Sequence, residues 1–186
     1  AAVYLNASRS ASLIRLSLGH FLVDAYAGFM LPILPLLALK LGFGLATTGI
    51  LLMVSSATSS ILQPLYGWVS EHLPRWNFLF LGVLLAGAFI GLLGICPDLG
   101  LLALCIALGY LGVGFYHPTA TTTVHGLQKT QQNLLMGCFI SAGRVGFAVG
   151  PLLAAFLVEW GGLPATLWAA LPALVAEPPP AAAPAR

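Results

Sequence analysis

The strongest constraint in this sequence is a succession of apolar runs close to twenty residues long, separated by short polar segments. A helix rises about 1.5 Å per residue, so about twenty apolar residues cross the roughly 30 Å hydrocarbon core of a bilayer. The runs are continuously apolar rather than alternating, which favours helices over membrane strands. We therefore predict an all-α membrane protein, a bundle of six transmembrane helices. The six runs are residues 16–39, 45–69, 78–95, 99–123, 134–158 and the shorter 163–176.

The composition excludes the main classes of water-soluble protein. Only 6% of the 186 residues are charged, against about a quarter in a typical soluble domain, and the mean hydropathy is +0.98. Most of the surface must therefore contact a lipid bilayer. The net charge of +2 includes no basic stripe, so no nucleic-acid partner is expected. The three cysteines lack the spacing of a metal or redox motif, and neither a metal nor a cofactor is expected.

The charge distribution divides the chain into three parts and orients it. Residues 1–15 are predicted to be a cytoplasmic N-terminal segment, residues 16–176 the six-span transmembrane domain, and residues 177–186 a Pro/Ala-rich cytoplasmic tail or the start of a central loop. An even number of spans puts both termini on one side, and that side collects Arg9, Arg15, Arg75, Lys129 and Arg186. Of the positively charged residues, the opposite side holds only Lys40. The excess of positive residues predicts that both termini are cytoplasmic, in a multi-pass protein of the cell (inner or plasma) membrane.

Two opposite charges lie inside the apolar runs, where charges are costly and usually serve a pathway. Asp24 lies about 12 Å into the first run and Arg144 about 15 Å into the fifth, counted from the same side. Equal depth permits an ion pair. His20 precedes Asp24 by four residues and so shares its helix face, and His117 in the fourth run can join the same pocket. Such a carboxylate can exchange a proton with an arriving anion, although the pair can also serve only to fix two helices together.

Three further polar side chains lie beside prolines that interrupt the helical hydrogen-bond ladder. Gln63 and Tyr66 flank Pro64, and Tyr116 precedes Pro118 by two residues. Interrupted helices are where transporters place binding sites and bending points. Gln63, Tyr66 and Tyr116 are therefore added to the candidate substrate path.

The loop between the second and third runs carries a recognisable pattern. Gly67, Glu71 and Arg75 stand within the segment Gly-Trp-Val-Ser-Glu-His-Leu-Pro-Arg. This segment resembles the motif that the major facilitator superfamily carries between its second and third spans. The resemblance implies that these three residues take part in conformational change.

The fifth run carries a second pattern of the same superfamily. Gly137, Gly146, Gly150 and Pro151 keep the spacing Gly-x8-Gly-x3-Gly-Pro, which is similar to the motif associated with antiporters. The resemblance implies a packed bend in this helix, against which the opposing half of a transporter rocks. A narrower likeness is to the fosmidomycin-resistance branch, through residues 19–24, 63–67 and 115–118.

Six spans are half of a facilitator, because such transporters have twelve spans in two similar halves with the cavity between them. The resemblance thus implies an N-terminal half that is completed by a C-terminal half, or by a second copy in a parallel homodimer. The predicted function is proton-coupled export of a small polar or anionic solute or drug by alternating access. Its partners are the bilayer, the solute and protons, with Asp24 as the protonatable group and Arg144 tuning it.

Other functions stay open. The same architecture permits uptake by symport or uniport, or a non-transporting six-helix subunit that stabilises a partner. A membrane enzyme is disfavoured, because neither an HExxH nor a GxSxG motif occurs and Asp24 is the only acid expected inside the membrane.

Overall fold

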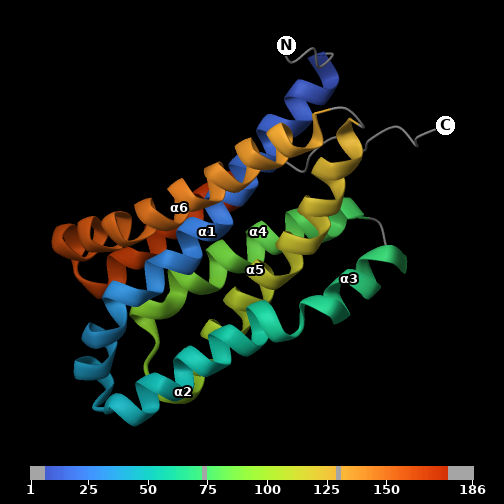
Figure 1. Ribbon diagram of the computed structural model, residues 1–186. Coiled ribbons are helices and arrows are strands. Elements are labelled where there is room, and N and C mark those ends of the chain that lie inside the picture. Colours follow the sequence, from blue (N-terminus) through green and yellow to red (C-terminus); the bar gives the residue numbers. More distant parts are fainter. Residues whose placement is uncertain (1–6, 73–74, 129–130, 176–186) are drawn as a thin grey trace.

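The structure, a computed structural model, describes residues 7–72, 75–128 and 131–175, and this part of the chain is helical almost throughout (Figure 1). The proposed tail at 177–186, with Arg186, and Lys129 in the fourth loop lie outside the described residues. The helices follow the order α1 (Ala7–Leu41), α2 (Leu45–Ser56), η1 (Ala57–Ile61), α3 (Gln63–His72), α4 (Arg75–Leu92), η2 (Leu93–Ile95), α5 (Leu99–Leu127), α6 (Gln132–Gly161), η3 (Leu163–Ala170) and α7 (Leu171–Val175).

Five of the described helical segments are long and apolar enough to cross a membrane: Ala7–Leu41, Leu45–Val69, Asn77–Ile95, Leu99–Leu127 and Gln132–Gly161. The sixth, Leu163–Val175, is apolar but shorter, and most of it is a 3-10 helix. The all-α, six-helix prediction is therefore confirmed, with a short last helix. The first helix begins at Ala7 rather than near residue 16, so Arg9 and Arg15 are part of α1.

The two described ends of the chain lie at one end of the bundle. Arg15 of α1 and Val175 of α7 line the same cavity, as an even number of crossings requires. The assignment of this end to the cytoplasm stays a prediction, because it rests on the distribution of positive residues.

The centre of the bundle is α1, which packs along α6 on one side and against α4 and α5 on the other (Figure 1). Its buried face includes Val23, Phe29, Met30 and Leu37, each with no measurable exposure. The opposite end of α1 is fixed by Lys40, whose ammonium group donates hydrogen bonds to carbonyl oxygens of η2 and of the residue after it, at 3.0 and 2.8 Å. These contacts hold the first and third membrane helices in register.

The α2–η1–α3 segment lies along the edge of the bundle and contacts mainly α5 (Figure 1). It bends at η1, a π-helical turn that precedes Pro64. Proline has no N–H to donate to the carbonyl four residues earlier, so the regular ladder cannot pass through this point. The hydroxyl of Thr58 bonds back to the carbonyl of Val54 at 2.9 Å. The predicted interruption at Pro64 is therefore a real bend.

The other interior prolines do not break their helices. Pro32 and Pro35 lie inside α1, Pro118 inside α5 and Pro151 inside α6, and each helix continues through them. Neighbouring helices can support the ladder where a proline removes one hydrogen bond.

Candidate functional site

The site is built on a close approach between α1 and α6. Gly146 and Gly150 of α6 lie directly against the backbone of α1, so that a Cβ at either position would overlap the carbonyl oxygens of Phe21 and Ala25 respectively. On the α1 side, a Cβ at Gly28 would lie 2.5 Å from a backbone oxygen of α6 and 3.2 Å from the ring of Pro151. Small residues permit backbone-to-backbone contact of this kind.

The other glycines of the two motifs lie in open surroundings. A Cβ at Gly137 or at Gly67 would meet no other atom within 4 Å. Gly137 is therefore not part of the α1–α6 contact. The side chains of Glu71 and Arg75 lie outside the described residues, so the role of the loop motif of Gly67, Glu71 and Arg75 stays a prediction.

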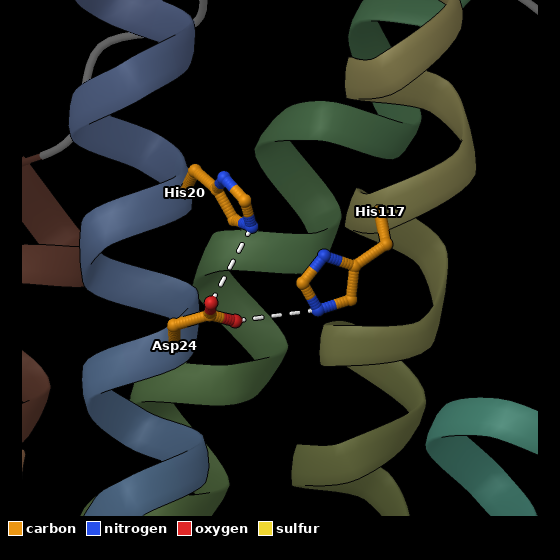
Figure 2. Close-up of side chains that lie close together, drawn as sticks. All are labelled: His20, Asp24 and His117. Atoms are coloured by element: carbon orange, nitrogen blue, oxygen red, sulfur yellow. Dashed lines mark ion pairs between the residues drawn. The ribbon is translucent and has the colours of Figure 1, made fainter. Parts of the chain in front are cut away.

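Three ionisable side chains meet beside this contact (Figure 2). The Nε2 atom of His20 lies 3.4 Å from one carboxylate oxygen of Asp24, one turn along α1. The Nε2 atom of His117, on α5, lies 3.3 Å from the other oxygen. The side chains of His20, Asp24 and His117 are 8%, 16% and 26% exposed, so the cluster is sheltered but open on one side.

The environment of His20 fixes the orientation of its ring. Its Nδ1 atom lies 2.9 Å from the backbone carbonyl oxygen of Phe139, and the two rings stack with centroids 4.1 Å apart. A carbonyl oxygen only accepts, so Nδ1 carries a proton and donates it, and Nε2 points to Asp24. Gly143 permits this arrangement, because a Cβ there would lie 2.6 Å from Asp24 Oδ2 and from His20 Nε2.

The cluster forms part of the wall of a cavity of about 660 Å³ between α1, α2, η1, α5 and α6. Its polar lining beyond the cluster consists of Ser55, Ser56, Ser59, Gln63, Tyr110, Thr121 and Arg144. Its apolar lining includes Met30, Met136, Phe139 and Phe147. This is a mixed surface with one sheltered charge cluster and one guanidinium group.

The expected ion pair between Asp24 and Arg144 is wrong. Among the described residues, the ion pairs of Asp24 are with the two histidines, and Arg144 is an exposed residue on the cavity wall. The depth along the helices was compatible with a pair, but Gly143 faces Asp24, and the next residue of a helix points about 100° away. Arg144 therefore faces the cavity rather than α1.

Gln63 joins the cavity, whereas the two predicted tyrosines do not line it. The hydroxyl of Tyr116 donates to the carbonyl of Leu16 at 2.6 Å, and that of Tyr66 donates to the carbonyl of Thr58 at 2.7 Å. Both rings are buried. They fix α5 to α1 and α3 to η1.

Several lining residues were missed. Tyr110 reaches the cavity wall and donates its hydroxyl proton to the carbonyl of Ala27 at 2.7 Å. Ser55 and Ser59 were detectable, because they recur with Gln63 every four residues and so share one face of the second span. The sequence also gave no reason to expect metal ligands, yet the ligand atoms of the three clustered residues lie within 4.8 Å of one another.

Long apolar helices around a polar cavity with a sheltered charge cluster define the class of this protein: it is a multi-pass helical membrane protein. The chain belongs to the Major Facilitator Superfamily, whose family model matches residues 16–177.

Two relatives match most of the chain. An uncharacterized MFS-type transporter, YfnC, from Bacillus subtilis (strain 168) is 25% identical over 165 residues, which are 86% of this chain and 40% of the relative. The fosmidomycin resistance protein of Escherichia coli (strain K12) is 28% identical over 161 residues, which are 87% of this chain and 40% of the relative. The chain thus spans about two fifths of the length of these relatives.

A solved structure supports the fold. The crystal structure of tetrameric PepTSo2 superposes with a TM-score of 0.71 and 16% sequence identity, and it covers 90% of this chain and 40% of that one. At this identity the match concerns the fold alone. The six helices correspond to one half of a facilitator fold.

Proposed function

We propose that this chain is one half of a facilitator transporter that exports a small polar or anionic solute or drug in exchange for protons, by alternating access. The observation that carries the proposal is the His20–Asp24–His117 cluster on the wall of the 660 Å³ cavity. Support also comes from the relative named for fosmidomycin resistance. A sheltered carboxylate at membrane depth is costly unless it serves a pathway.

The cluster suits proton exchange because its three ionisable groups are in contact, so that the protonation of one affects the other two. Asp24 accepts from either imidazole, and histidine changes its charge near physiological pH. A proton that arrives at Asp24 leaves both histidines without their anionic partner, so binding at one group affects the other two. His20 and His117 are the neighbours that adjust to the charge of Asp24.

The sequence predicted that Arg144 tunes Asp24, but in this proposal Arg144 binds the solute. Since it faces the cavity and not Asp24, its guanidinium group is available to an anionic solute. Guanidinium binds carboxylate and phosphate groups through two parallel hydrogen bonds. The methionine and phenylalanine side chains of the cavity would contact an apolar part of the same solute.

The cavity needs a second half to enclose it. Large apolar side chains are exposed on α2 and α6, including Met53 and also Phe147, which lines the cavity. In transporters of this family the solute lies between two six-helix halves. The partner is a C-terminal half or a second copy of this chain, in the cell membrane.

The proposal is tested by transport in proteoliposomes that carry a pH-sensitive dye inside. Fosmidomycin, taken from the name of the relative, is the first solute to add. We expect proton movement opposite to the solute, and its loss in Asp24→Asn. The matched control is His72→Asn, because this exposed histidine on α3 lies outside the cavity.

Each other outcome identifies a different function. Unchanged coupled flux in Asp24→Asn would remove this residue from the mechanism. Proton and solute movement in the same direction would indicate symport, and solute flux without protons would indicate uniport. Absence of flux for a panel of anionic and neutral solutes, from the chain alone and with a partner half, would favour a non-transporting subunit.

A further inference from the structure

The geometry points to a second occupant for the cluster: we propose that His20, Asp24 and His117 bind one divalent transition-metal ion of the zinc class. The three residues come from two helices, α1 and α5, and their side chains gather around the carboxylate of Asp24, with one ligand atom of each within 4.8 Å of the others (Figure 2). Two imidazoles and one carboxylate form a ligand set that zinc, cobalt and nickel accept. The proposal rests on these positions and goes beyond solute transport.

The distances are close to those across a metal ion. Zinc lies about 2.0–2.2 Å from imidazole nitrogen and carboxylate oxygen, so two ligands in a tetrahedral site are about 3.4 Å apart. The Nε2 atoms of His20 and His117 lie 3.4 and 3.3 Å from different oxygens of Asp24, so a carboxylate that binds through one oxygen has this spacing to one histidine and must turn toward the other. All three ligand atoms lie within 4.8 Å of one another, so the widest gap has to shorten by at most roughly 1.4 Å on binding.

The orientation of His20 supports a cation in this position. Because Nδ1 donates its proton to the carbonyl oxygen of Phe139, the neutral ring presents the lone pair of Nε2 to a carboxylate oxygen of Asp24. This lone pair and the carboxylate oxygen repel unless a proton or a metal ion lies between them, so the position suits a cation. A backbone carbonyl that holds the far nitrogen is also the usual support of a metal-bound histidine.

The site has room for a further ligand. Three protein ligands leave a fourth position free, and here that position opens to the cavity, which the cluster lines together with Arg144. Water can fill it. An anionic oxygen of a transported solute can also fill it, and only this last step rests on the proposed function.

The ligand set also predicts selectivity. Calcium and magnesium prefer six or more oxygen ligands, which this cluster does not offer. Zinc and cobalt tolerate imidazole nitrogen. We therefore expect zinc to bind and magnesium not to compete with it.

The test measures metal binding by the purified full chain in detergent, with an affinity tag that contains no histidine and after removal of metal by a chelator. Isothermal titration should give one zinc ion per chain, and cobalt should give the visible absorption bands of a nitrogen- and oxygen-bound ion. His117→Gln should weaken zinc binding at least tenfold, and Asp24→Asn likewise. His72→Gln is the matched control and should bind as the unchanged protein does.

His117 is partly exposed on the cavity wall, so its substitution is compatible with folding, which size-exclusion chromatography would check. Absence of saturable zinc binding would overturn the proposal, as would an equal loss in His72→Gln and His117→Gln. Proton-coupled solute flux without zinc binding would overturn the metal site and leave the transport function. Zinc binding without solute flux would overturn the transport function and leave the metal site.

Discussion

The α1–α6 interface and the α2–η1–α3 segment form two walls of one cavity, and they are packed in opposite ways. The helices α1 and α6 meet backbone to backbone through glycines, and a central face of α1 is fully buried. The α2–η1–α3 segment is mostly exposed, contacts mainly α5 and contains a π-helical turn before Pro64. His20 and Asp24 of the charge cluster belong to the tightly packed wall, and the serine-rich lining belongs to the loosely packed one.

The difference in packing suggests that the α1–α6 interface holds the charge cluster in place, whereas the α2–η1–α3 segment can change its conformation more easily. Ligand atoms keep their geometry only where the supporting side chains cannot move, and the α1–α6 interface supplies this constraint to His20 and Asp24. Segments with little burial and an interrupted hydrogen-bond ladder open at lower free energy. We therefore expect changes in the α1–α6 interface to cost far more stability than changes in the α2–η1–α3 segment.

Gly146→Leu should produce the largest effect. Any Cβ at this position overlaps the carbonyl oxygen of Phe21, so α6 must move away from α1. We expect a loss of about 3 kcal/mol, the upper end of the range for overpacking, measured as thermal unfolding in detergent. Gly137→Leu, on the same helix in open surroundings, should change little. Equal losses in the two variants would contradict the close approach.

Tyr116→Phe should come next. It removes the hydrogen bond that joins the hydroxyl of α5 to the carbonyl of Leu16 at 2.6 Å. A buried hydrogen bond contributes about 1 kcal/mol net, so a similar loss of unfolding free energy is expected. Tyr66→Phe removes a bond to Thr58 within the α2–η1–α3 segment, and its cost should be smaller. The reverse order would mean that the two walls do not differ as described.

Pro64→Ala tests whether proline causes the irregular turn in the loosely packed α2–η1–α3 segment. It restores an N–H at the point where the ladder is interrupted, so η1 gains one hydrogen bond. Hydrogen–deuterium exchange at residues 57–61 should slow about fivefold, the factor for about 1 kcal/mol. Pro35→Ala in α1, which lies away from η1, serves as the control. Unchanged exchange in Pro64→Ala would show that the turn has another cause.

Ser59→Ala should have the smallest effect on stability. Its hydroxyl bonds only to the carbonyl of Ser55, one turn earlier in the same segment, at 2.8 Å, and to the neighbouring Ser60. The loss should stay within about 0.5 kcal/mol, as for other substitutions at weakly packed positions. A loss as large as that of Tyr116→Phe, in the same thermal assay, would show that this wall is more constrained than its packing indicates.

The fold was predictable because it depends on features that a sequence displays directly. Length and continuity of the apolar runs define the membrane helices, and Pro64 marks the one described bend among the predicted interruptions. The described helix α1 begins nine residues before the predicted apolar run, because Arg9 and Arg15 are polar but compatible with a helix that extends beyond the membrane core. The short 3-10 helix at the end was anticipated only as a short run.

The site was only partly predictable because spacing gives depth along a helix but not direction around it. His20 and Asp24 share a face by their four-residue separation, and this proximity is found. The partner of Asp24 depends on how α5 and α6 are rotated, and there His117 replaces Arg144. The hydroxyl of Tyr116 bonds to a carbonyl 100 residues away in the chain, which no local pattern indicates.

The contact between the backbones of α1 and α6 also has an evolutionary consequence. No side chain larger than hydrogen fits at Gly146 or Gly150, so substitutions at these two positions are not tolerated. The serine-rich wall carries no comparable restriction, and its side chains can be exchanged at little cost. Sequence change in descendants of this chain should therefore accumulate on α2 and η1 rather than at these glycines.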